Sequence, residues 1–174
     1  MTSHEILSTP RLRLRLLAPD DAVFIHALVN DADWLRYIGD RNVRTLDDAR
    51  GYISNGPAAM FERHGHALFA VERRDDATPI GICGILKREY LDAPDLGFAF
   101  LPAYRAQGYA REAAAATLAW GLEAHGFGRM LATTALDNDA SVRLLEKLGF
   151  RFERTARMPG DAHDVKLFAW TAAR

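Results

Sequence analysis

The segment from Asp95 to His125 constrains the fold more than any other part of the chain. An apolar run, DLGFAFLP, is followed by a turn that contains Gly108 and then by an alanine-rich stretch without proline. The apolar run predicts a strand, and the alanines predict a helix over Arg111–His125. A further apolar run at 129–136 predicts a second strand, parallel to the first and joined to it by the helix.

The turn before this helix has two interpretations. A helix N-terminus exposes unpaired N–H groups, and Gly108 has no Cβ, so an anion could approach the backbone closely. Arg105 and Arg111 would add side-chain charge. The alternative is a plain strand-to-helix turn, which the hexamer Arg105–Ala110 alone favours. Its pattern, R-x-x-G-x-A, matches neither the P-loop nor the dinucleotide-binding fingerprint.

The rest of the chain alternates between helical and strand patterns. Leucines alternate with arginines at 11–16, and this predicts a half-buried strand whose arginines face solvent, in preference to an anionic ligand for them. Thr45 and Asp48 have the spacing of a helix N-cap, and that helix should break near Asn55–Gly56–Pro57. Other predicted helices are 20–31 and 138–148, and other predicted strands are 66–73, 79–87, 95–101, 150–158 and 163–172. The order predicts one mixed α/β (α+β) domain over residues 1–174, with its core at about 9–172.

Charge and cysteine content limit the partners. The 174 residues carry a net charge of -1, whereas nucleic-acid-binding domains usually have a basic excess. A single cysteine excludes an internal disulfide and favours a reducing compartment. No apolar stretch approaches the ~20 residues that span a bilayer, and the N-terminus lacks a signal-peptide pattern. We therefore expect a cytoplasmic protein that binds neither nucleic acid nor membrane.

Two segments carry a family resemblance. DLGFAFLPAYRAQGYAREAA resembles the acetyl-coenzyme A motif of the GNAT N-acetyltransferases, [RQ]-x-x-G-x-[GA], and DNDASVRLLEKLGF resembles their second motif. Together with the TPRLRLR opening, they are most similar to the branch of the ribosomal-protein alanine N-acetyltransferases. The resemblance implies a central, mostly antiparallel sheet of six to seven strands, splayed in a V between the fourth and fifth, with about four flanking helices.

The resemblance also implies where acetyl-coenzyme A binds as cosubstrate. The phosphate cradle falls on the seven residues of the turn and the helix start. The strand before it would bind the pantetheine arm, largely through its backbone, and alternation places Phe98 and Phe100 on one face. An asparagine of the second motif would contact the same arm. The implied cofactor residues are Phe98, Ala99, Phe100, Arg105, Ala106, Gln107, Gly108, Tyr109, Ala110, Arg111 and Asn138.

The implied reaction is direct acetyl transfer to a primary amine in a ternary complex. Asp95 stands where several family members carry a glutamate base, although it could equally be a strand-edge aspartate paired with arginine or solvent. Leu145 occupies the position of the usual tyrosine acid, so we expect Ser141 to substitute; the alternative is that Ser141 bonds to its own helix backbone. Cys83 is interpreted as a core residue. The six histidines show no metal spacing, and we expect no metal.

The acceptor side is less defined. In the family fold its walls come from the first helical region and the last hairpin, which here contain Trp34, Arg36, Tyr37 and Ile38 on one side and Gly160–Val165 on the other. Protein N-termini and small-molecule amines both remain open as acceptors. A non-catalytic coenzyme A sensor is the alternative function, and a homodimer is compatible with the family, although no interface pattern is present.

Overall fold

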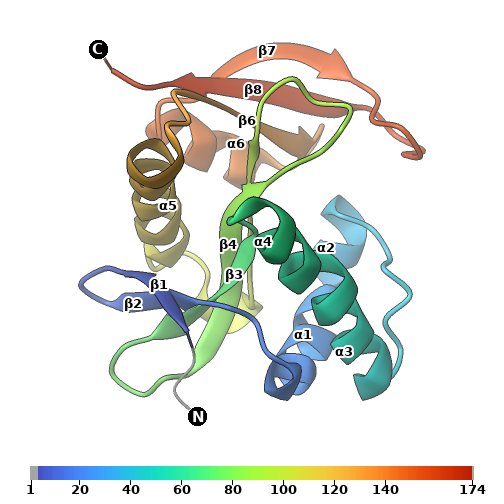
Figure 1. Ribbon diagram of the computed structural model, residues 1–174. Coiled ribbons are helices and arrows are strands. Elements are labelled where there is room, and N and C mark those ends of the chain that lie inside the picture. The colour runs from blue at the N-terminus through green and yellow to red at the C-terminus, as the bar shows by residue number, and fades with distance from the viewer. Residues whose placement is uncertain (1–3, 174) are drawn as a thin grey trace.

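The computed structural model describes residues 4–173 and contains one eight-stranded sheet (Figure 1). All neighbouring strands are antiparallel except β5 and β6, which are parallel. The strands, in their order across the sheet, are β1 (Glu5–Ser8), β2 (Leu12–Arg15), β3 (Leu68–Arg73), β4 (Pro79–Leu86), β5 (Asp95–Phe100), β6 (Arg129–Ala135), β8 (Val165–Thr171) and β7 (Arg151–Ala156).

Helices cover both faces of the sheet, as Figure 1 shows for α5 on one side and α1 to α4 on the other. The core under α5 contains Phe69, Ile85 and Leu118, and α6 contributes Leu145 to it. The core on the opposite face is built around Ile25 and other residues of the first helices. The helices are α1 (Ala22–Val29), α2 (Ala32–Tyr37), α3 (Leu46–Ile53), α4 (Ala59–His64), α5 (Tyr109–His125) and α6 (Asp139–Lys147).

The sheet opens between β5 and β6. A single pair of residues, Asp95 and Leu131, is in register between them, next to a hydrogen bond from the Leu131 amide to the Pro94 carbonyl at 2.9 Å. No further ladder forms along the two strands within the described residues. The two strands therefore form a V with its apex at Asp95. They correspond to the fourth and fifth predicted strands, 95–101 and 129–136, between which the V was expected.

The predicted fold is confirmed, with differences in detail. The sheet has eight strands rather than six or seven because β1 pairs with β2 at its edge, ahead of the predicted core. The described chain has six α-helices rather than about four, since α2 is helical and α4 is separate. The α-helical pattern breaks near Pro57 as predicted, but the chain stays helical there: Ser54–Ala58 form a π-helical turn that joins α3 to α4. A π turn changes the local hydrogen-bond pattern, so a proline fits there without ending the helix.

The arginines of β2 are not a solvated face. Arg15 is buried and its guanidinium contacts Asp21 at 2.8 Å and Glu72 at 2.8 Å. These hydrogen-bonded carboxylates raise the pKa of Arg15 further above its usual value. A strand that alternates leucine with arginine can thus be covered on both faces when acidic side chains pair with the buried arginine on its second face.

Candidate active site

The turn between β5 and α5 has the geometry of an anion cradle. After a 3-10 turn at Pro102–Tyr104, Ala106 and Gly108 both adopt the left-handed region, with φ of 58° and 85°. The first hydrogen bond of α5 runs from Glu112 N–H to the Gly108 carbonyl at 3.1 Å. Among residues 4–173, the amides of Gln107 through Arg111 have no acceptor. Left-handed residues before a helix start form concave sets of N–H groups that suit a phosphate.

Arg11 lies beside this cradle, whereas the sequence favoured a solvated strand face over an anionic ligand for this arginine. Its guanidinium stacks over the Tyr109 ring at 4.3 Å, donates to the Gln107 carbonyl at 3.1 Å and pairs with Glu112 at 2.8 Å. Its Nη2 would lie 3.2 Å from a Cβ added at Gly108. Arg11 and Glu112 are far apart in sequence, so no local signal could have identified the contact. A fixed positive charge therefore borders the cradle.

Arg105 uses its side chain differently from the expectation. Its Nε donates to the Phe100 carbonyl at 3.0 Å, and its two terminal nitrogens contact Asp31 at 2.6 Å and Asp33 at 2.5 Å. The guanidinium is therefore committed to α2 and β5. Arg105 contributes to the cradle through the backbone turn, whereas the Arg111 side chain is exposed.

The backbone of β5 presents free groups to the V. The Leu101 amide donates to the Ile80 carbonyl at 2.9 Å, so alternate residues, Ala99 among them, direct their N–H and C=O toward β4. Phe98 and Phe100 direct theirs toward the V, and the Arg105 bond to the Phe100 carbonyl agrees with this assignment. On β6, the buried hydroxyl of Thr134 has no hydrogen-bond partner. These groups suit an extended polar chain lying between the strands.

The second motif begins α6 on the α5 side of the sheet. Asn138 is the N-cap of α6, and its Oδ1 accepts from the Ser141 amide at 3.3 Å. The Ser141 hydroxyl is half-buried and makes no hydrogen bond to any residue from 4 to 173. It is therefore free to act outside the helix. Leu145 is buried in the core beneath α5, so this residue packs in the core and has no proton to donate.

Asp95 is the most unusual polar residue of the site. Its side chain is 2% exposed at the apex of the V, its Oδ2 lies 3.3 Å from Arg88 Nε, and its Oδ1 has no partner. Burial raises the pKa of Asp95 to about 6, while Arg88 lowers it by charge attraction. The aspartate pairs with an arginine, as one interpretation expected, and it keeps one oxygen unpaired within residues 4–173, so its role as base stays a prediction.

Asp95 and Ser141 lie on opposite faces of the sheet. Strand alternation places Asp95 on the face of Ala99, which packs with the core of α1 and α3. Helix α6 packs with the core of the α5 face through Val142 and Leu145. The V joins the two faces, so a reactant approaching from one side can meet another that enters from the other.

The predicted acceptor walls divide into buried and exposed parts. Trp34 is 5% exposed in the core, and its indole N–H has no hydrogen-bond partner, whereas Ile38 is 41% exposed. Tyr37 is half-buried beneath the Arg36 guanidinium, which lies 4.9 Å from its ring. Arg36 also pairs with Asp137 at 2.9 Å. In the last hairpin, Asp161 is exposed, and Asp164 pairs with Arg157 at 3.0 Å.

Other candidate features lie away from the V. Burial raises the pKa of the Cys83 thiol to about 12, as expected of a core cysteine. Residues 4–173 contain no cluster of three or more metal-ligating side chains. Within the same range, no helix combines the length and apolarity needed to cross a bilayer.

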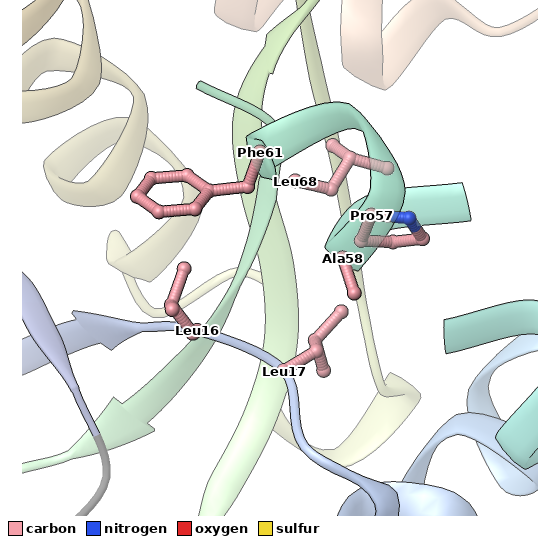
Figure 2. Close-up of a pocket in the computed structure, with 6 residues that line it drawn as sticks. All are labelled: Leu16, Leu17, Pro57, Ala58, Phe61 and Leu68. Carbon is pink, nitrogen blue, oxygen red and sulfur yellow. The ribbon is translucent and has the colours of Figure 1, made fainter. Parts of the chain in front are cut away.

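The cavity drawn in Figure 2 has a volume of about 80 Å³ and lies beside the π-helical turn. Its lining is entirely apolar, so it offers no group that could act on an amine or a thioester. It is lined by Leu16, Leu17, Pro57, Ala58, Phe61 and Leu68.

Comparison with known proteins decides the family. The Acetyltransferase (GNAT) domain model matches residues 11–151, which include the cradle and both motifs. The chain belongs to the GNAT acetyltransferase family. It is thus an acyltransferase, and the family predicted from the two motifs is confirmed.

Relatives of this GNAT chain support the same assignment. It is 33% identical over 170 residues to the uncharacterized N-acetyltransferase YoaA of Bacillus subtilis, covering 94% of this chain and 95% of YoaA. A GNAT-family acetyltransferase structure from Bacillus anthracis is 27% identical with a TM-score of 0.79, covering 96% of this chain and 98% of its own.

The ribosomal L7/L12 α-N-protein acetyltransferase RimL, in complex with coenzyme A, shares the fold at 18% identity and a TM-score of 0.78. This match covers 97% of this chain and 98% of RimL. This likeness shows that the two proteins share one fold.

The site of this GNAT chain fits the chemistry of coenzyme A. The unpaired amides of the cradle suit a pyrophosphate, and a Cβ at Gly108 would intrude beside Arg11. The free backbone groups of Phe98 and the orphaned Thr134 hydroxyl suit the amides of a pantetheine arm.

Proposed function

We propose that this chain transfers acetyl from acetyl-coenzyme A directly to a primary amine, either a protein N-terminus or a small-molecule amine, in a ternary complex. The observation that carries the proposal is the buried, half-unpaired carboxylate of Asp95 at the apex of the V. A buried acceptor oxygen without a donor is costly, and an amine N–H supplies the missing donor.

The cradle and β5 hold the cosubstrate in this proposal. The amides from Gln107 to Arg111 bind its pyrophosphate, Arg11 adds charge beside them, and the backbone of Phe98 and Phe100 pairs with its arm. Asn138 has its side-chain N–H₂ free to contact the same arm, since only its Oδ1 caps α6. When bound, the thioester supplies an acetyl carbon that is open to attack by an amine.

Asp95 acts as the base. An amine must be neutral to attack, and a carboxylate with a pKa near 6 is ionised at pH 7 yet more basic than an ordinary aspartate. Its Oδ1 accepts the amine proton directly or through one water. The neighbouring Arg88 guanidinium stabilises the ionised form of this buried carboxylate, so that Asp95 can accept the proton.

Two further groups act at the reacting atoms. The Phe98 N–H points into the V and donates to the carbonyl oxygen as charge develops there. The Ser141 hydroxyl donates to the departing sulfur from the opposite face of the sheet. These roles replace the tyrosine that Leu145 excludes.

A thiol-release assay with acetyl-coenzyme A and a broad amine panel tests the proposal. We expect Asp95→Asn to lower kcat by at least about 100-fold and Ser141→Ala by about 10-fold, with the Kd for coenzyme A almost unchanged. The alternative, a non-catalytic coenzyme A sensor, draws its support from Leu145. It predicts cofactor binding by calorimetry without thiol release from any amine.

We also propose that the chain works in the cytoplasm, on the basis of its single, buried cysteine.

A further inference from the structure

Asp95 and Arg88 together leave both an acceptor and a donor unused. Among residues 4–173, Asp95 Oδ1 has no hydrogen-bond partner. The Arg88 Nε contacts Asp95 Oδ2, and its Nη1 donates to the Tyr90 hydroxyl at 3.1 Å. Arg88 Nη2 has no hydrogen-bond partner among residues 4–173. The Arg88 side chain is 33% exposed, so the pair is reached from solvent through the guanidinium. A free carboxylate oxygen thus adjoins free guanidinium N–H groups.

The surroundings favour an anion beside this pair. Burial raises the pKa of the Tyr52 hydroxyl on α3, where the side chain is half-buried, and the charges of Arg41 and Arg88 lower it. Asp161 in the β7–β8 turn also acts on Arg88 through its charge, and no ion pair joins them within 4 Å. Arg88 pairs with the buried carboxylate of Asp95, and Arg41 adds a second positive charge near Tyr52, so an additional negative charge is accommodated more easily than an additional positive one.

We propose that the acceptor is a small amine with a carboxylate on the adjoining carbon, as in an α-amino acid. Its amine donates to Asp95 Oδ1, and its carboxylate accepts from Arg88. In such a molecule the two charged groups are one carbon apart, which matches a carboxylate and a guanidinium in direct contact at 3.3 Å. Charge-assisted bonds at both ends fix the direction of the nitrogen lone pair.

The step balances with the groups present. The amine nitrogen forms a bond to the acetyl carbon while the carbon–sulfur bond of the thioester breaks and sulfur keeps the electron pair. The proton lost by nitrogen goes to Asp95, which returns it to solvent, and the thiolate accepts a hydrogen bond from the Ser141 hydroxyl and takes its proton from solvent. Arg88 holds the acceptor's carboxylate throughout, so it determines specificity without exchanging a proton.

The inference rests on the proposed function and is tested by kcat/KM at pH 8, above the pKa of about 6 that Asp95 has beside Arg88. The substrates are α-amino acids, their α-amides and the corresponding decarboxylated amines, together with short peptides that have free N-termini. We expect the wild-type enzyme to favour amino acids over both analogues by about 10–100-fold.

Arg88→Gln should remove most of that preference by lowering turnover of the acids alone, and Arg88→Lys should retain part of it. Arg154→Gln, an exposed β7 arginine, is the control and should change neither ratio. Each variant's urea midpoint shows whether it folds, and if Arg88→Gln is unfolded, Arg88→Lys and the wild-type substrate ratios decide.

Two results overturn the inference while the proposed function stands. One is equal or better turnover of peptides or amides than of amino acids by the wild-type protein. The other is an equal loss for all amines in Arg88→Gln, which would mean that Arg88 only supports Asp95. Absence of thiol release from every amine, with coenzyme A still bound, overturns the proposed function itself and the inference with it.

Discussion

At the scale of single residues, Asp95 shows a conflict between burial and charge. Its side chain is almost completely buried and is paired on one oxygen only. Because burial raises its pKa to about 6, the folded chain binds a proton there more tightly than the unfolded chain, whose reference pKa is 3.8. This contribution to the free energy of unfolding is therefore largest below pH 4 and is lost as the pH rises through 6.

The variant Asp95→Asn measures the free-energy cost of burying the ionised carboxylate independently of catalysis. At pH 7.5 the ionised aspartate costs on the order of 2–3 kcal/mol, which an asparagine avoids, whereas at pH 4 both side chains are neutral. We expect the Tm difference, variant minus wild type, to be more positive at pH 7.5 than at pH 4, as measured by calorimetry. The Asp161→Asn variant, an exposed site, should show no such trend. A larger gain at pH 4 would contradict the raised pKa.

Only some of these residues could be predicted from the sequence. Asp95 and Ser141 were proposed because each lies inside a motif with fixed spacing, and their catalytic roles stay predictions. Arg88 was not proposed, because its contact depends on the register that places Leu86 opposite Asp95. Arg11 was assigned to a solvated strand face since its partner lies about a hundred residues away, and the side chain of Arg105 was assigned to phosphate because its two aspartates lie in a distant helix.

At the scale of elements, α2 is fastened at both ends. Its N-cap, Asp31, contacts Arg105 of the cradle turn at 2.6 Å, and Asp33 contacts the same guanidinium. Near its other end, Arg36 pairs with Asp137, which directly precedes Asn138. The helix that carries the proposed acceptor wall is thus joined to both segments proposed to hold the cosubstrate.

Arg105→Gln should loosen this attachment. Removing the guanidinium leaves Asp31 partly buried without its charge partner, so we expect the free energy of unfolding to fall by about 1–2 kcal/mol. We also expect KM for the amine to rise several-fold with kcat less affected. Urea unfolding and steady-state kinetics measure these quantities. Arg50→Gln, which removes an exposed pair with Asp47, should cost less than about 0.5 kcal/mol. A similar cost for both variants would contradict the attachment.

Local chemistry predicted elements well where it acts within a few residues. The capping box of Thr45 and Asp48 was predicted and is present, with a hydrogen bond of 3.0 Å from the Asp48 amide to the threonine hydroxyl. The turn at Pro57 was not predicted, since proline usually ends a helix and nothing local indicates a π turn. The strand β1 exists only through its pairing with β2, which short-range patterns do not encode.

At the scale of the whole molecule, two sheet segments meet at one register pair. Strands β1 to β5 form one segment and β6, β8 and β7 form the other, as Figure 1 shows, and α5 connects them along the chain. The V was predicted correctly from the order of the motifs in the sequence, in which a strand, the cradle and a helix precede the next parallel strand. A ligand in the V contacts both segments, so its binding should stabilise the whole fold.

Coenzyme A should therefore raise the Tm as its concentration increases. At a hundred times its Kd, binding should add about 2.7 kcal/mol to the free energy of unfolding. Gly108→Glu should abolish this shift, since a side chain at φ 85° would enter the cradle and add negative charge. The matched control is Gly126→Ala, at φ 69° in the C-cap of the same helix, where an added Cβ meets nothing within 4 Å.

Both glycine substitutions strain a left-handed position and should lower the Tm of the free protein. Only the cradle variant should lose the response to coenzyme A. Differential scanning fluorimetry over a cofactor titration distinguishes the two effects. If Gly126→Ala lost the response as well, the shift would depend on the integrity of α5. An unchanged response in Gly108→Glu would mean that the pyrophosphate binds elsewhere, because a carboxylate inside the cradle cannot coexist with a bound anion without a large electrostatic cost.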